Sequence, residues 1–273
     1  MPTVQSNGIT LHYTDTGGTG RPVVLIHGWP LSGDSWSEQI PVLADAGYRV
    51  LAYDRRGFGA SDKPAEGYDY DTMSADLAGL LEALDLDDVT LVGFSMGGGE
   101  VARYVGTHGT GRLHSVVFAA AVPPFLLKTD DNPDGGLADA DVQGMIDGVT
   151  ADREGFLDTF TTGFFSVDGE LAVSESQRQQ AIELEKPALD AALAGCIDAF
   201  GRTDFRADLA AIDVPTLVIH GDSDATVPVE VSGERTAASI EGAEKVVIAK
   251  APHGLNVSHS KEFNDALVEF LAR

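Results

Sequence analysis

The hydrophobic positions of the chain follow a strand-like pattern in some segments and a helical spacing in others. Short apolar runs rich in β-branched residues recur along the chain, and such runs are typical of parallel strands buried on both faces. These runs are residues 23–26, 50–53, 89–92, 116–118, 216–219 and 246–248. A hairpin is also predicted from residues 3–5 and 9–14, because they flank Asn7-Gly8, a strong two-residue turn signal. Together these segments predict a mostly parallel sheet of eight strands.

Helical patterns separate the apolar runs. Residues 75–84 carry apolar side chains at helical spacing, and residues 263–271 close the chain as an amphipathic helix. Strands that alternate with helices in this way predict an α/β fold, in which helices flank the sheet.

One stretch, residues 122–204, breaks this alternation. It contains Pro123-Pro124, an acidic loop at residues 130–136 and several helix-like segments. A helical insertion after a central strand is typical of a lid over a functional site. We therefore predict an α/β core made of residues 1–121 and 205–273, with a helical lid inserted at 122–204.

Charge and composition exclude several classes of partner. The chain has 273 residues and a formal net charge of −25, from 43 acidic and 18 basic side chains. A surface this acidic repels nucleic acid and anionic membranes, so we expect neither as a partner. No apolar run is long enough to span a bilayer, the N-terminus lacks the pattern of a signal peptide, and Cys196 is the only cysteine. The expected location is cytoplasmic.

Ser95 is the candidate nucleophile. The motif Gly93-Phe94-Ser95-Met96-Gly97 follows the predicted strand 89–92 and precedes a helix. A strand-to-helix turn of this type holds its serine in a strained conformation, with the hydroxyl exposed at the N-terminus of the helix. The alternative is a glycine-rich turn in which the serine is incidental.

A serine nucleophile needs a base and an acid, which follow it in the order Ser, acid, His in this type of fold. His253 lies in a loop between the last predicted strand and the last helix, and is preferred to His259, which lies near a helix start. Asp222 and Asp224 both follow the strand 216–219. We expect Asp222 to cap the turn through local backbone N–H groups and Asp224 to orient the histidine.

The loop His27-Gly28-Trp29-Pro30 is expected to complete an oxyanion hole. The backbone N–H of Met96, next to the nucleophile, is one predicted donor, and the N–H of Trp29 is the other. His27 is expected to hold this loop by hydrogen bonds. The Trp29 carbonyl is a hypothetical acceptor for a small protic nucleophile, because Pro30 favours an extended conformation at Trp29.

Aromatic residues suggest the walls of a substrate pocket. Phe156, Phe160 and Phe164 recur at helical spacing, which is typical of packing between lid and core as well as of a pocket wall. The predicted pocket residues are Trp29, Pro30, Phe125, Phe160 and Phe164.

Several motifs in order resemble one family of α/β-hydrolase fold, the cofactor-free haloperoxidases, also called non-heme chloroperoxidases or bacterial arylesterases. The resemblance covers nearly the whole chain. It includes Val122-Pro123-Pro124 and Thr203-Asp204-Phe205-Arg206, which are more specific than the triad motifs. The other matching segments are residues 27–30, 53–59, 93–98, 221–224 and 252–254.

The resemblance implies a serine esterase that hydrolyses small, including aryl, carboxylic esters through an acyl-enzyme. It also implies perhydrolysis, in which hydrogen peroxide replaces water and releases a peracid that oxidises halide. Neither reaction requires a metal or another cofactor, so we expect none. The resemblance also favours Asp224 as the acid and implies assembly into homo-oligomers.

Other functions remain open on the same residues. Haloalkane dehalogenases and most epoxide hydrolases place aspartate at the nucleophile position, so Ser95 argues against both. A carbon–carbon bond hydrolase or a lactonase would use the same triad, and a ligand receptor could retain it without turnover.

Overall fold

The central sheet has eight strands in the computed structural model, which describes residues 2–273. The spatial order is β1-β2-β4-β3-β5-β6-β9-β10. Only the pairs β1–β2 and β2–β4 are antiparallel, so the prediction of a mostly parallel eight-stranded sheet is confirmed. The strands are β1 Thr3–Ser6, β2 Ile9–Asp15, β3 Pro22–Ile26, β4 Arg49–Tyr53, β5 Val89–Phe94, β6 Leu113–Ala119, β9 Thr216–Gly221 and β10 Glu244–Ile248.

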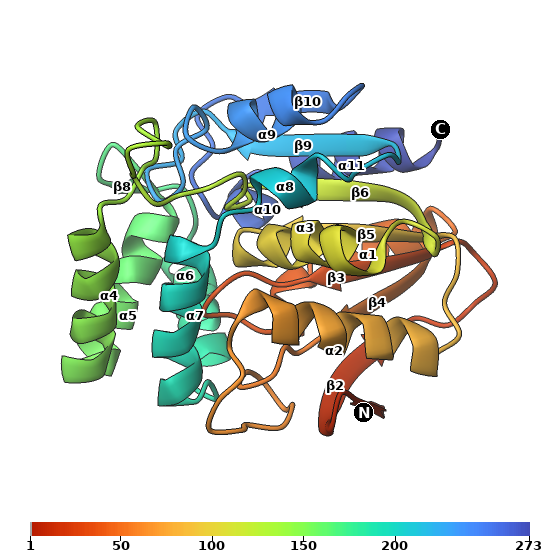
Figure 1. The fold of residues 1–273 in the computed structure, drawn as a ribbon, viewed down its shortest axis with the longest axis horizontal. Coiled ribbons are helices and arrows are strands. Elements are labelled where there is room, and N and C mark those ends of the chain that lie inside the picture. The colour runs from red at the N-terminus through yellow and green to blue at the C-terminus, as the bar shows by residue number, and fades with distance from the viewer. Residues whose placement is uncertain (1) are drawn as a thin grey trace.

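Helices cover both faces of the sheet (Figure 1). Successive residues of a strand point to opposite faces, so Val24 and Ile26 belong to one hydrophobic core and Val23 and Leu25 to the other. The first core receives side chains from α2 Tyr70–Ala83, α3 Met96–His108, α8 Arg206–Leu209 and α9 Gly233–Ser239. The second receives them from the 3-10 helix η1 Gly33–Trp36, α1 Ile40–Asp45, α10 Leu255–Ser258 and α11 Ser260–Leu271.

Three details differ from the sequence prediction. Helix α2 begins five residues before the predicted start, because the side chain of Asp69 accepts a hydrogen bond from the Thr72 N–H and caps the helix. Helix α11 begins at Ser260 rather than at residue 263. Strand β10 is not buried on both faces, since it lies at the sheet edge and Val247 is 41% exposed.

The segment between β6 and β9 contains mostly helices, at one end of the sheet (left in Figure 1). It also contains one short hairpin that the sequence pattern did not indicate, β7 Ser166–Val167 with β8 Glu170–Leu171. The boundaries 122–204 of a lid stay a prediction. The helices within residues 122–204 are α4 Asp139–Ala151, α5 Arg153–Phe164, α6 Glu175–Glu185 and α7 Asp190–Arg202, and α8 follows them before β9.

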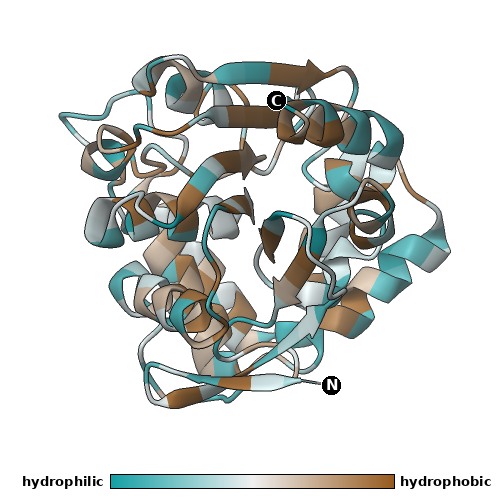
Figure 2. Ribbon diagram, turned by 90° about the vertical axis from the view of Figure 1, so that its right-hand side faces the viewer, coloured by the Kyte–Doolittle hydropathy of each residue, from teal (hydrophilic) through white to brown (hydrophobic). Residues whose placement is uncertain are grey.

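Hydropathy follows this layering. In Figure 2 the central strands carry mostly apolar segments, whereas the outer helices alternate between polar and apolar turns. Within residues 2–273, no helix combines the length and the apolar character needed to cross a bilayer.

Candidate active site

Ser95 lies at the turn between β5 and α3, as the motif predicted. Its backbone has φ 53° and ψ −118°, a left-handed conformation that costs a non-glycine residue about 1–3 kcal/mol. The N–H of Ser95 donates to Ala119 O at 2.8 Å, which fixes the turn to the neighbouring strand β6. Ser95 therefore stands just before the first turn of α3, where unpaired N–H groups favour negative charge.

Two glycines allow the backbone to approach Ser95 closely. A Cβ atom on Gly97 would lie 2.4 Å from Ile26 O, so only glycine lets α3 begin this near to β3. A Cβ atom on Gly28 would lie 2.8 Å from the Phe94 ring and 3.1 Å from Ser95 Cβ. The loop after β3 is thereby packed directly against the serine.

His253 lies in the loop between β10 and α10, and it is 1% exposed. Its Nε2 lies 2.8 Å from Ser95 Oγ, and its Nδ1 lies 2.7 Å from Asp224 Oδ2. The rings of Phe94 and Phe164 pack on the imidazole, with centroids at 5.3 and 4.9 Å. The imidazole is therefore shielded from water and aligned between an acceptor and a hydroxyl.

Asp224 contacts His253 with one oxygen and the backbone with the other. Its Oδ1 accepts the N–H groups of Thr226 at 2.9 Å and Val227 at 2.8 Å. The prediction that Asp222 caps the turn was therefore wrong. Asp224 itself caps the turn, whereas Asp222 is exposed and accepts the distant Lys250 N–H at 2.6 Å.

These contacts determine the charge state of Asp224. Burial alone raises the pKa of this carboxyl, but the charge of His253 and hydrogen bonds from His220 and His253 outweigh burial and hold the pKa well below its usual value. Asp224 is thus ionised at neutral pH and is placed to stabilise a protonated His253.

The carbonyl of Gly28, in the loop after β3, has two contacts. Gly28 O accepts the Leu31 N–H at 3.1 Å and lies 2.9 Å from Nδ1 of His27. The Gly28–Trp29 peptide is trans, so the N–H of Trp29 points away from that clamped carbonyl. Met96 is the first residue of α3, and its N–H has no acceptor within the helix.

A buried ionic network supports this loop, and sequence reasoning did not find it. Arg55 Nη2 donates to His27 O at 2.8 Å, and the Arg55 N–H donates to His27 Nε2 at 3.0 Å. The guanidinium in turn pairs with Glu100 Oε2 at 2.7 Å, and Glu100 also accepts the hydroxyl of Tyr53. Since His27 Nε2 accepts, the ring carries its hydrogen on Nδ1 and donates to Gly28 O. The prediction that His27 holds the loop by hydrogen bonds is confirmed.

Burial shifts the pKa values of two members of this network, His27 and Glu100. It lowers the pKa of His27 well below the usual value, and the nearby charge of Arg55 acts in the same direction. Burial also raises the pKa of Glu100, although Arg55 and Tyr53 oppose this effect. Cys196 is fully buried, and burial raises the pKa of its thiol to about 12.

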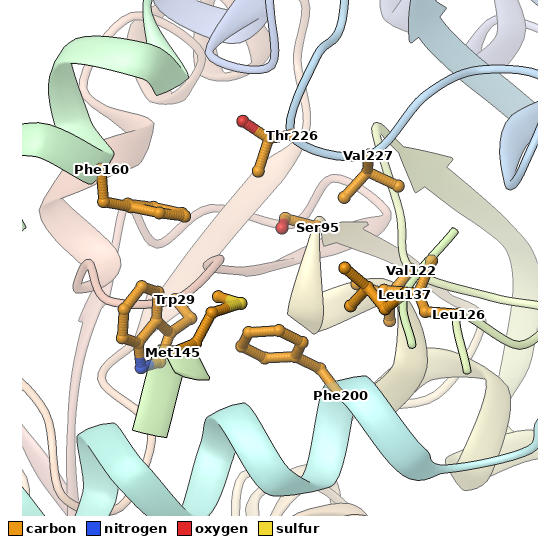
Figure 3. A pocket seen from close by; sticks show the side chains of 10 residues that line it. All are labelled: Trp29, Ser95, Val122, Leu126, Leu137, Met145, Phe160, Phe200, Thr226 and Val227. Carbon is orange, nitrogen blue, oxygen red and sulfur yellow. The ribbon is translucent and has the colours of Figure 1, made fainter. Parts of the chain in front are cut away.

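Ser95 opens into a small cavity of about 50 Å³ (Figure 3). Aromatic rings and a methionine lie on one side of the serine, and aliphatic side chains lie on the other. Among residues 2–273, no charged side chain lines the cavity. Its walls are formed by Trp29, Ser95, Val122, Leu126, Leu137, Met145, Phe160, Phe200, Thr226 and Val227.

Of the five predicted pocket residues, only Trp29 and Phe160 line this cavity; their rings meet edge to face at 4.9 Å. Pro30 is buried but does not reach the cavity. The ring of Phe125 packs instead against the guanidinium of Arg206, which lies 5.3 Å from the centroid of the ring. Phe164 packs against His253 instead.

Sequence reasoning missed most of the cavity wall. Leu137, Met145 and Phe200 come from three separate parts of the segment between β6 and β9, and no spacing in the sequence links them. Val227 was within reach of inference, because it lies three residues after Asp224 and the same turn brings both to the site.

A group of three or more His, Cys, Asp or Glu side chains suited to a metal ion is not found within residues 2–273.

The chain is similar to proteins of known class over almost its full length. A family described as alpha/beta hydrolase fold matches residues 21–260.

Three relatives illustrate the range of the similarity. A bromoperoxidase from Bacillus anthracis is 53% identical with a TM-score of 0.96, and the match covers 100% of both chains. A non-heme chloroperoxidase of Kitasatospora aureofaciens is 45% identical over 97% of each chain. A bifunctional esterase/perhydrolase of Acinetobacter calcoaceticus is 33% identical, also over 97% of each.

Proposed function

The chain belongs to the α/β-hydrolase fold family and to its non-heme chloroperoxidase group, and from this premise we propose that it is a serine esterase with perhydrolase activity. The observation that carries the proposal is the hydrogen-bonded chain Ser95–His253–Asp224 beside an apolar cavity. Its substrates are small uncharged carboxylic esters, because the cavity is small and offers no charged partner.

In the first half of the reaction, Ser95 Oγ attacks the ester carbonyl and its proton passes to His253 Nε2. Asp224 stabilises the resulting imidazolium. The N–H groups of Trp29 and Met96 bind the oxyanion, an interaction in which one donor is typically worth about two to three orders of magnitude in rate. The tetrahedral intermediate collapses, and the leaving alkoxide takes the proton from His253.

In the second half, a small protic nucleophile attacks the acyl-enzyme and gives its proton to His253. Water yields a carboxylic acid, and hydrogen peroxide yields a peracid; in both cases Ser95 takes the proton back as the acyl bond breaks. A released peracid transfers oxygen to halide and becomes the carboxylic acid again. Halide oxidation through this route needs no redox centre in the protein.

We further propose that residues 122–204 act as a lid that closes the acyl site. Leu137, Met145, Phe160 and Phe200 from this segment form much of the cavity wall, which supports a role in substrate selection. We also propose that the protein assembles into homo-oligomers, as its resemblance to the family implies, and that it acts in the cytoplasm.

The first test compares wild type with Ser95→Ala in the release of p-nitrophenol from p-nitrophenyl acetate. Turnover by the wild type that falls to the uncatalysed level in the variant is expected, because the nucleophile is lost. Equal turnover in both proteins, or none in the wild type, would contradict the esterase assignment and favour a lactonase, a carbon–carbon hydrolase or a receptor.

The perhydrolase part has a test of its own. Bromide oxidation is expected only when hydrogen peroxide and a small carboxylic ester are both present, and it should disappear in Ser95→Ala. Bromide oxidation that continues without a carboxylic acid or an ester would contradict the peracid route while leaving the esterase activity intact.

A further inference from the structure

His220, at the carboxyl end of β9, is a second histidine that contacts Asp224, in addition to His253. The side chain of His220 is completely buried. Its Nε2 lies 2.8 Å from Val227 O and 3.3 Å from Asp224 Oδ2. The same carboxylate oxygen lies 2.7 Å from Nδ1 of His253. One oxygen atom is therefore shared by two imidazoles.

The surroundings of His220 determine which nitrogen carries its hydrogen. A carbonyl can only accept, so the contact with Val227 O requires a hydrogen on Nε2. Nδ1 is buried and has no hydrogen-bond partner within residues 2–273. It faces Gly233 at the start of α9, where a Cβ atom would lie only 2.5 Å away. A second hydrogen on Nδ1 would be an unpaired buried donor, so the contacts place the hydrogen of the ring on Nε2.

We propose that His220 is a positioning residue of the triad, which donates its Nε2 hydrogen jointly to Asp224 Oδ2 and Val227 O and thereby tunes the basicity that Asp224 imposes on His253. This inference deepens the proposed hydrolysis and rests on it for its catalytic meaning. Asp224 then accepts from four donors, two backbone and two imidazole. Every donor added to the carboxylate withdraws negative charge from the oxygen that faces His253.

The contact with Val227 extends the effect of His220 to the substrate cavity. The N–H of Val227 holds Asp224 Oδ1, its carbonyl holds His220, and its side chain lines the cavity beside Ser95 (Figure 3). A single residue thus connects the acid, the second histidine and the cavity wall. His220 fixes the position of this residue as well as that of Asp224.

Few charges compete with these contacts. Asp224 is the only acidic side chain within residues 2–273 that forms an ion pair with either imidazole. The remaining neighbours of His253 are the Ser95 hydroxyl from the β5–α3 turn and the rings of Phe94 and Phe164. A change at His220 is therefore transmitted to His253 through Asp224.

The test is an NMR titration of the His253 ring in the wild type, His220→Leu and His220→Gln. Leucine removes the donor, so Asp224 holds a proton on His253 more strongly, and the midpoint of the titration should rise by roughly half a pH unit. Glutamine places an amide N–H near the position of Nε2, so its midpoint should match the wild type. The acid limb of the kcat/KM profile for p-nitrophenyl acetate should shift in parallel.

Two results would overturn the proposal. One is a folded His220→Leu protein in which His253 titrates as in the wild type; the other is a His220→Gln protein shifted as far as His220→Leu. The titration needs no turnover, so it is independent of the Ser95→Ala test of the esterase assignment. If His220→Leu does not fold, ¹⁵N NMR of the wild type decides, because the contact with Val227 O requires the hydrogen of His220 on Nε2. A neutral ring with its hydrogen on Nδ1 contradicts the inference.

Discussion

Two regions of the molecule each bury a carboxyl group, and the two groups differ in the number of hydrogen bonds that they accept. Asp224, in the loop after β9, is 5% exposed, and Glu185, at the end of α6, is 1% exposed. Both oxygens of Asp224 accept hydrogen bonds. Only one oxygen of Glu185 does so, from the hydroxyl of Thr161, and its Oε2 has no partner within residues 2–273.

The difference appears in the proton affinity of the two groups. Burial raises the pKa of Glu185 to about 7, with little compensation from Thr161. At Asp224 burial acts in the same direction, but the imidazoles reverse it and hold the pKa well below its usual value. Burial alone therefore favours the neutral acid, and the number and charge of the donors decide whether a buried carboxyl stays ionised.

The largest effect on activity is expected when the charge of Asp224 is removed. Asp224→Asn keeps the shape but stabilises the wrong tautomer of His253 and cannot stabilise an imidazolium, so kcat/KM for p-nitrophenyl acetate should fall by about 10⁴. Asp222→Asn is the matched control, since Asp222 is exposed and bonds the Lys250 N–H instead. Similar losses in both variants would mean that Asp224 is not the acid of the triad.

A third buried carboxyl, Glu100, differs from both, because its partner is the positively charged guanidinium of Arg55. Glu100→Gln leaves the guanidinium of Arg55 buried without a counter-charge, so the free energy of unfolding in urea should fall by about 3–5 kcal/mol. The double variant Arg55→Met, Glu100→Leu removes both charges and should recover part of that loss. If the double variant is less stable than Glu100→Gln, the unpaired charge is not the cause.

The smallest effect is expected at Glu185, and it has the opposite sign. The folded protein binds a proton at Glu185 with a pKa of about 7, above the reference value of 4.5, so the stability present below pH 4.5 is lost as the pH rises through 7. Glu185→Gln should therefore gain stability relative to the wild type across this range, up to about 3 kcal/mol at high pH. Urea unfolding at several pH values measures the difference.

Glu183→Gln is the control for this prediction, because Glu183 is exposed on the same helix and pairs with Lys186. Its stability difference from the wild type should not change with pH across the same range. A Glu185→Gln protein whose advantage is equally independent of pH would show that Glu185 does not titrate near neutrality in the folded state.

The strands and the strand-to-helix turn could be predicted from the sequence because their signals are local. A continuous apolar run is typical of a parallel strand buried on both faces, whichever sheet contains it. The motif at residues 93–97 is recognisable because the strand-to-helix turn requires small residues around the serine. Helix starts were less accurate, since the cap of α2 depends on the single side chain of Asp69. The edge position of β10 was not predicted, because strand order is set by packing across the sheet.

The sequence by itself determined the α/β architecture of this protein and singled out Ser95, His253 and Asp224, since residue type, order and strand context are local properties of the chain. Only the tertiary structure decided which oxygen of Asp224 faces which partner, that His220 contacts the same oxygen as His253, and that Arg55, paired with Glu100, holds the loop at His27. It also decided that Met145 and Phe200, rather than Phe125, enclose the cavity. These features are contacts between residues far apart in the chain, and a buried polar or apolar group finds its partner only when the core closes around it.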